Sequence, residues 1–367
     1  MNCTRVAEFG LFGDSKIEPD GRRFQTKQDI PLSPTKTMIV SSDSKSENSR
    51  RRNTGKPYCS ITSDIDTLES IYKGQDCARG SYSYAEFAMG LETFANVLER
   101  YKAPATLFMV GRDFQRESDH QTILDMHNLG HEIANHSTTH PQGFRHLSLP
   151  MMEQEIADME ESCLALTGRR PVGFRSPGWN VDDQTLEILK RRGYTYESSV
   201  FPTSAMPLLK LLHWWSQRNR SAADRTTMGP LRYLFAPTLP YRTGLKRLDR
   251  PGEGGLVEFP VTVTPILRFP FFATVFASTG IDFFYWCLKW LVRWKWPIQF
   301  QFHLSDFLDY HHPALVDQVP SLGAGQYVPK SLSMSLEQKM QLFIPILDAL
   351  AENYQFVTLE KWAQEIA

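Results

Sequence analysis

Residues 131–140 read His-Glu-Ile-Ala-Asn-His-Ser-Thr-Thr-His. The first four residues are predicted to form a short strand, and a polar stretch with two histidines follows at once. Helical spacing of apolar residues indicates a helix on each side, at 121–128 and at 151–167. A strand between two helices is the repeating unit of a parallel sheet, so this stretch predicts an α/β fold.

The same alternation continues in both directions along the chain. Further strands are predicted at 58–62, 105–110, 172–174, 256–263, 298–303 and 355–358. Further helices are predicted at 84–101, 183–191, 282–292 and 336–350, and a short helix ends the chain. Seven or eight such strand–helix cycles predict a closed but distorted (β/α) barrel.

The chain is predicted to consist of a tail and one folded domain. Residues 1–57 are predicted to be a disordered polar tail, because 41–56 hold no apolar side chain. One alternative is that Arg50–Arg52 form a basic patch for anionic lipid, and another is a true start at Met38. The folded domain is predicted to span 58–367, with 201–255, rich in Pro, Arg and Trp, as a long loop insertion over one barrel face.

Composition excludes several classes of protein. The 367 residues include 40 Lys plus Arg and 41 Asp plus Glu, and a net charge of −1 argues against a nucleic-acid partner. Five cysteines without close spacing fit neither a disulfide framework nor a cysteine zinc site, so a reducing, cytoplasmic location is expected. Residues 1–20 lack the apolar core of a secretory signal, and no apolar run reaches the roughly 18 residues of a spanning helix.

Two aspartates follow the first predicted strand. Asp64 and Asp66 are two residues apart, and residues at this spacing point to the same side of a strand. The carboxyl ends of barrel strands are where barrel active sites lie, so both carboxylates could point into one site. The alternative is that they are loop and helix-capping acids.

Two histidines follow the strand at 131–134. His136 and His140 could bind one metal ion if the chain makes a helical or tight turn between them. Two imidazoles and one carboxylate would suit a catalytic metal with open positions. A polar surface loop is the alternative.

Two more strand ends carry a basic residue. Arg175 precedes a Pro-Gly turn, where its guanidinium could clamp a carboxylate or simply hold a structural loop. His303 ends the strand at 298–303, where it could be a general acid or a satisfied core histidine.

Taken in this order, these elements resemble the polysaccharide deacetylases of the NodB-homology group, carbohydrate esterase family four. The most specific match is His-Ser-x-x-His at 136–140, and Gly-His-Glu-Ile-Ala-Asn-His at 130–136 is also typical. Ala-Thr-Leu-Phe at 105–108 and Phe-Val-Thr-Leu-Glu at 356–360 resemble the family too. The resemblance covers 58–367 as a NodB-homology deacetylase domain and is weakest over 201–255.

The resemblance implies a catalytic role for three residues. Asp64 would be the catalytic base and Arg175 would pair with it, while His303 would be the acid that protonates the leaving amine.

The resemblance also implies a metal and a substrate site. Asp66, His136 and His140 would hold a divalent metal, zinc before cobalt, manganese or iron, which would act as a Lewis acid and activate water. Gly178 would supply an oxyanion-stabilising backbone amide, and Trp179 would form a wall of the sugar site.

The sequence departs from the usual family motifs at three places. Ile65 separates two aspartates that are usually adjacent, and Thr67 stands where glycine is usual; spaced aspartates occur in branches such as the lipid-linked aminoarabinose deformylases. Gly178 stands where an aromatic residue usually follows proline. Glu197 stands where aspartate is common, and its role is left open.

The implied function is metal-dependent removal of an N-acyl group, acetyl first, from a carbohydrate: an oligosaccharide or a lipid-linked glycan precursor. One alternative is a deformylase of a polyprenyl-linked amino sugar, and another is a metal-free, allantoinase-like amidohydrolase, a branch that tends to lose metal ligands. A non-catalytic carbohydrate-binding protein would be favoured if Asp64 or His303 were substituted, and both are present.

One predicted helix carries an unusual number of aromatic residues. Residues 281–296 hold four tryptophans among lysines and arginines, which is typical of an interfacial helix. Such a helix would give peripheral contact with the inner face of a membrane. The favoured alternative is an outer barrel helix packed on the sheet, since the strand–helix cycle requires a helix there.

Overall fold

The structure, a computed structural model, describes residues 55–73, 84–216, 228–316 and 330–366. The predicted tail at 1–57 therefore lies outside the described residues except for 55–57. No helix in the described ranges is both long enough and apolar enough to cross a lipid bilayer.

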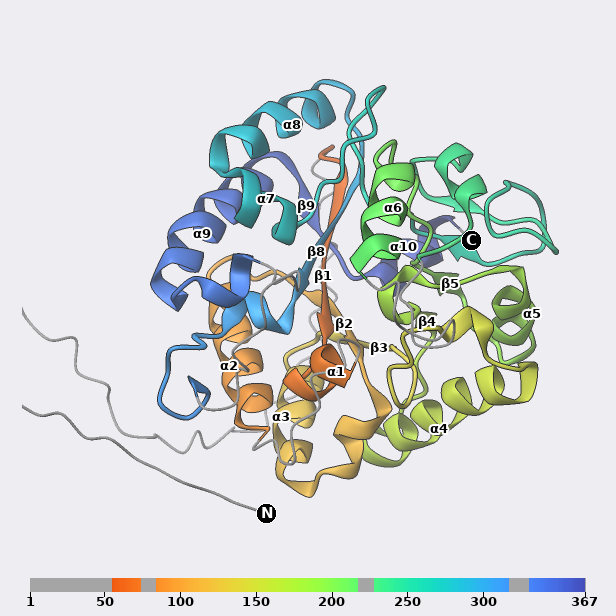
Figure 1. The fold of residues 1–367 in the computed structure, drawn as a ribbon, viewed down its shortest axis with the longest axis horizontal. Helices are drawn as coiled ribbons and strands as arrows, with labels where there is room; N and C mark the ends of the chain where they lie inside the picture. The colour runs from red at the N-terminus through yellow and green to blue at the C-terminus, as the bar shows by residue number, and fades with distance from the viewer. Residues whose placement is uncertain (1–54, 74–83, 217–227, 317–329, 367) are drawn as a thin grey trace, which may run out of the picture. The chain divides into compact units, whose positions relative to one another are not determined.

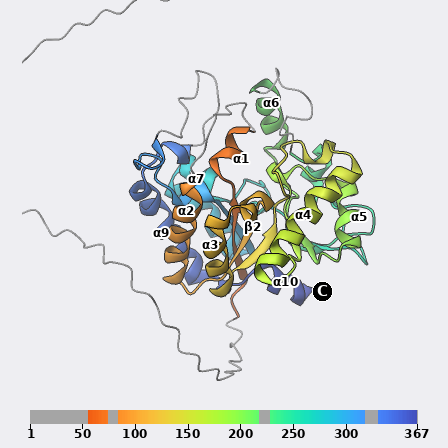
Figure 2. The same cartoon turned by 90° about the horizontal axis from the view of Figure 1, so that it is seen from below.

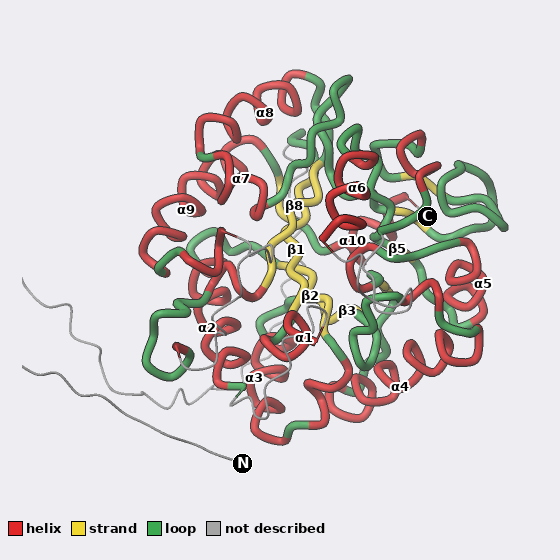
Figure 3. The backbone as a smooth tube through the Cα atoms, viewed as in Figure 1, coloured by secondary structure: helices red, strands yellow, loops and turns green. Residues whose placement is uncertain are grey.

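The centre of the domain is a curled, mostly parallel sheet, drawn in yellow in Figure 3. Its order is β6-β7-β5-β4-β3-β2-β1-β8, with β9 added beside β1. All neighbouring pairs are parallel except β6 with β7, which are antiparallel. The strands are β1 Tyr58–Ile65, β2 Ala105–Met109, β3 Glu132–Asn135, β4 Gly173–Phe174, β5 Tyr196–Glu197, β6 Tyr241–Arg242, β7 Val257–Glu258, β8 Ile298–His303 and β9 Gln355–Phe356.

Helices surround this sheet, as Figure 1 shows. They are α1 Leu68–Lys73, α2 Ala85–Glu99, α3 Glu117–Asn128, α4 Leu149–Thr167, α5 Asp183–Arg191, α6 Met206–Ser216, α7 Ala273–Thr279, α8 Ile281–Arg293, α9 Leu336–Asn353 and α10 Leu359–Ile366. Every strand and helix predicted from the sequence is present, with ends that differ by a few residues. The exception is the strand predicted at 256–263, of which only 257–258 pair regularly.

The alternation of side chains along β1 explains both the core and the site. Ile61 and Ile65 belong to the apolar core that α2, α8 and α9 cover. Thr62 and Asp64 point to the opposite side, where both contact Arg175. The outer face of the strand therefore stabilises the fold, and its inner face carries polar chemistry.

The barrel is distorted, as predicted. The prediction that it closes is wrong, because the hydrogen-bonded order of the described strands has two free ends. Among the described residues, no strand pairing joins β8 to β6 or β7. A side chain makes the nearest link: the backbone N–H of Gln299 on β8 donates to Oγ1 of Thr262, 2.9 Å away. After β7, the Phe259 and Val261 N–H groups still donate to the backbone oxygens of Glu197 and Val200, but the described residues show no strand pairing with β8, so the barrel is curled but left open.

The sequence predicted a long loop at 201–255, but the structure shows regular elements there as well. It contains α6, the short 3-10 helix η5 at Leu231–Phe235, and β6. Strand β6 is only two residues long and pairs with β7 in the opposite direction. Such a short element leaves no periodicity in the sequence, which explains why it was missed.

The carboxyl ends of the strands lie at one end of the domain. Figure 2 shows α1, which directly follows β1, and α6 at this same end. Because parallel strands end together, the residues that follow β1, β3, β4 and β8 are brought to one edge of the sheet.

Candidate active site

A group of three metal-ligand side chains forms at this edge. Asp66, His136 and His140 place one ligand atom each within 4.8 Å of the others. Nε2 of His140 lies 3.2 Å from Oδ1 of Asp66, and Nε2 of His136 lies 3.5 Å from the same oxygen. None of the three atoms is hydrogen-bonded elsewhere in the described part of the chain, although all are buried. A bound divalent cation would satisfy buried polar atoms that converge on one point in this way.

The turn that presents the two histidines is tight and not helical. Ser137 and His140 have φ of 65° and 56°, in the left-handed region. The side chain of Asn135 accepts from the Ser137 N–H at 2.8 Å, and Oγ of Ser137 accepts from the His140 N–H at 3.1 Å. These short polar side chains hold the turn closed, as Asx- and ST-turns do.

His136 is fixed in the tautomer that a metal requires. Its Nδ1 lies 2.7 Å from the backbone oxygen of Arg175, so Nδ1–H donates and Nε2 is left as the acceptor. Burial lowers the pKa of His136, which favours the neutral ring. Burial alone would raise the pKa of Asp66, but His140 and His136 together lower it. The donor set is thus an anionic carboxylate and a neutral imidazole beside a second imidazole, and it fits a divalent metal.

Asp64 is held between two side chains. Its Oδ1 lies 2.6 Å from Nη1 of Arg175, and its Oδ2 accepts from Nε2 of Gln301 at 2.7 Å. Arg175 is fully buried, and its guanidinium stacks 3.9 Å from the ring centre of Phe108. Arg175 also donates to the backbone oxygen of Ser198 at 3.0 Å, so the guanidinium cannot rotate away. Sequence reasoning missed Gln301, since glutamine carries no motif signal.

His303 lies beside Asp64 on the neighbouring strand. The β1–β8 register pairs the two residues directly, so their side chains project to the same face. His303 is half-buried, and its Nδ1 lies 3.4 Å from Oγ1 of Thr274. The buried Asp306 carboxylate accepts from the His303 backbone N–H at 2.9 Å. Base and acid candidates therefore project side by side from adjacent strands.

The turn after β4 contributes the two candidate substrate residues. Gly178 and Trp179 lie in the 3-10 turn η3 (Pro177–Trp179) with φ of 56° and 53°. The Trp179 ring packs between Phe201, 4.9 Å away, and Phe272, 5.5 Å away. Its indole N–H has no partner among the described residues. The oxyanion and sugar-wall roles stay predictions.

Glu197 is linked to this turn through one hydroxyl group, that of Ser199. Ser199 Oγ donates to the Glu197 carboxylate and accepts from the Ser176 N–H at 2.8 Å, one residue before the turn. Across the sheet Glu197 is paired with Glu258, and burial raises the pKa of both carboxyls. A proton shared between the two carboxyls would offset the repulsion of two buried negative charges, and the Ser199 contact leads us to expect that Glu197 positions the turn.

We expect Ser199→Ala to lower activity by loosening this turn. The buried Ser176 N–H and Glu197 carboxylate would each lose a partner, at about 1–3 kcal/mol of stability for each group left unsatisfied. Thermal unfolding and kcat/KM on an acylated glycan would be measured. Ser60→Ala is the matched control, because the Ser60 hydroxyl is equally buried but unpartnered among the described residues. Equal losses in both variants would contradict the positioning role.

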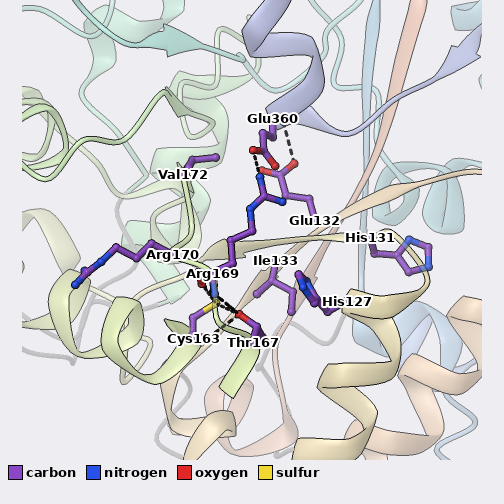
Figure 4. A pocket seen from close by; sticks show the side chains of 10 residues that line it. All are labelled: His127, His131, Glu132, Ile133, Cys163, Thr167, Arg169, Arg170, Val172 and Glu360. Atoms are coloured by element: carbon purple, nitrogen blue, oxygen red, sulfur yellow. Dashed lines mark hydrogen bonds and ion pairs between the residues drawn. The ribbon is translucent and has the colours of Figure 1, made fainter. Parts of the chain in front are cut away.

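A second polar cluster lies at the opposite ends of the strands (Figure 4). Burial raises the pKa of Glu132 to about 7, and its carboxylate accepts from Tyr196 at 2.6 Å and from Thr106 at 2.8 Å. It also accepts from the Glu360 N–H at 2.9 Å, and the Glu360 side chain pairs with Arg169. These contacts attach α10 to the sheet at the end opposite the candidate active site. The cluster therefore stabilises the fold and is separate from that site.

Proteins named as polysaccharide or peptidoglycan deacetylases resemble this chain, in sequence and in structure. The profile of the family described as Polysaccharide deacetylase matches residues 88–197, which include His136, His140, Arg175 and Glu197. A crystal structure from Mycobacterium smegmatis, named for the polysaccharide deacetylases, aligns with a TM-score of 0.55 over 86% of this chain and 91% of its own, at 18% identity. That likeness shows the fold, a distorted (β/α) barrel.

Two curated relatives match in sequence. A peptidoglycan deacetylase from Helicobacter pylori is 25% identical over 174 residues, 46% of this chain and 58% of the relative. A peptidoglycan deacetylase-like protein from Gibberella zeae is 32% identical over 128 residues, 32% of this chain and 36% of the relative. The chain thus spans less than two thirds of either relative. Residues 88–197 of the chain match the polysaccharide deacetylase family, as the motifs in that range predicted.

Proposed function

We propose that this protein is a metal-dependent hydrolase that removes an N-acetyl group from a carbohydrate, either an oligosaccharide or a lipid-linked glycan precursor. One observation carries the proposal: the buried Asp66–His136–His140 group lies at the same sheet edge as an Asp64 already clamped by Arg175. A stabilising role alone would not leave three buried ligand atoms without partners.

The side chains present can divide the reaction among them. Asp64, oriented by Arg175 and Gln301, accepts the proton of the attacking water. His303 donates a proton to the nitrogen as the amide bond breaks, which releases the amine and the carboxylic acid.

The remaining groups stabilise the reacting acyl group and bind the sugar. The Gly178 N–H donates to the developing oxyanion, and Trp179 lines the sugar site with its ring. Asp66, His136 and His140 would hold a divalent cation, most simply Zn²⁺, which supplies Lewis-acid stabilisation when bound.

The direct test is metal analysis of the purified chain, followed by acyl release from a panel of acylated glycans. We expect about one divalent ion per chain, and acetate from N-acetylated glycans in preference to formate from N-formylated ones. Formate as the only product would replace this proposal with the deformylase. Release of neither acid by the metal-loaded protein would contradict hydrolysis and favour a carbohydrate-binding protein.

The proposal includes a cytoplasmic location. It is supported by three cysteines within the described ranges, Cys59, Cys163 and Cys287, which are free and buried.

A further inference from the structure

Helix α8 has an inner and an outer face of different character. Phe284, Cys287, Leu288 and Leu291 are buried against the sheet, so the helix does cover the barrel. The outer face presents three tryptophans that packing covers only in part. Trp286, Trp290 and Trp294 keep 38% to 47% of their surfaces exposed.

The fourth tryptophan of the predicted interfacial helix, Trp296, does not lie on this face. It is partly buried against the core. It follows the end of α8 and leads into β8, where the chain must turn inward. Trp286 stacks on Phe283, with ring centres 5.7 Å apart.

The exposed apolar surface continues from α8 onto a neighbouring loop. In loop 264–270, Ile266 and Leu267 are 75% and 50% exposed, and Phe269 contacts Trp286 at 6.1 Å. The loop is fastened from its other side, because Arg268 donates to the backbone oxygen of Ala236 at 3.2 Å. That bond places it beside Phe235, which is 79% exposed.

Backbone strain makes the exposure of Ile266 more informative. Its φ is 65°, a conformation that β-branched residues rarely adopt. Asparagine or glycine would suit this position better on grounds of folding alone. A strained and largely exposed isoleucine therefore indicates a contact made outside the folded chain.

The charges beside this surface are mainly basic. Lys289 and Arg293 are exposed on α8, and Lys295 follows its end; Asp282, in the first turn, is the acid of the same helix. Tryptophan beside lysine and arginine is the combination that settles in the headgroup region of a bilayer, with rings in the interface and cations at anionic lipids.

We propose that α8 and loop 264–270 form a docking surface for an anionic lipid bilayer. The surface adjoins the candidate active site, because the same chain segment continues to Phe272, which contacts Trp179, and to Thr274, which contacts His303. Docking would hold the site at the lipid surface, where a membrane-borne glycan would reach it. The inference concerns where the protein binds and stands whether or not it hydrolyses amides.

Vesicle co-sedimentation of the full chain tests the proposal without an activity assay. Wild type is expected to bind vesicles of equal parts phosphatidylglycerol and phosphatidylcholine, more weakly as salt rises, and to bind pure phosphatidylcholine poorly. Ile266→Asn/Leu267→Asn should lose most of the binding. Lys289→Gln/Arg293→Gln/Lys295→Gln should weaken it by about a hundredfold on the anionic vesicles.

Two control variants keep the test specific. Leu129→Asn/Met151→Asn changes two similarly exposed apolar residues, one directly after α3 and one on α4, and should bind like wild type. Arg50→Gln/Arg51→Gln/Arg52→Gln removes a basic cluster outside the docking surface and should leave most binding intact.

Any of three results would overturn the proposal. The first is wild type that ignores anionic vesicles at low salt, and the second is binding that follows Arg50–Arg52 and not the docking surface. The third is a lipid-free dimer that Ile266→Asn/Leu267→Asn dissociates in sedimentation velocity, which would make a second copy the occupant. Melting temperatures of all variants identify any that fail to fold.

Discussion

His140→Ala is expected to remove bound metal and activity together. The change leaves Asp66 and His136 as the only members of the group, and two side chains hold a divalent ion poorly. Loss of Lewis-acid stabilisation withdraws several kcal/mol from the transition state, about a thousandfold or more in rate. Metal content by elemental analysis and acetate release by the same preparation are the paired measurements.

The exposed His146 supplies the control for this experiment. It lies after the same turn but outside the group, so His146→Ala should keep metal and activity. His136→Ala should behave like His140→Ala. If either ligand variant keeps one metal ion per chain, the metal is bound elsewhere and the proposed site is wrong.

Asp64→Asn is expected to abolish turnover while the metal stays bound. Asparagine can still accept from Arg175 through its single oxygen, and its NH2 can donate to Oε1 of Gln301 once that amide turns over, but it cannot take a proton from water. Loss of a general base costs about 10²–10⁴-fold in rate. Metal content should remain that of wild type, because the three ligand atoms belong to other residues.

The stability of this variant must be measured beside its activity. Arg175 is fully buried, and removing the charge of its partner leaves a buried cation uncompensated, at about 3–5 kcal/mol. Assays therefore belong well below the melting temperature of the variant. Loss of metal in a folded Asp64→Asn protein would instead make Asp64 a ligand and place the role of Asp66 in doubt.

The sequence by itself determined the order of the elements and the residues of the candidate site. Apolar periodicity is a local property, so β8 at Ile298–His303 and α5 at Asp183–Arg191 could be predicted to the residue. The spacing of His136 and His140 is local too, and the motif in which they stand carries the chemistry of the family. The roles assigned to these residues remain predictions for the variants above to test.

Only the tertiary structure decided which distant side chains meet. Register between β1 and β8 brings Gln301 onto Asp64 and His303 beside it, although more than 230 positions separate them in the chain. The same holds for Ser199 beneath the turn at Ser176 and for the two-residue pairing of β6 with β7. Each depends on how segments far apart in sequence are aligned in space, and periodicity within one segment carries no information about that alignment.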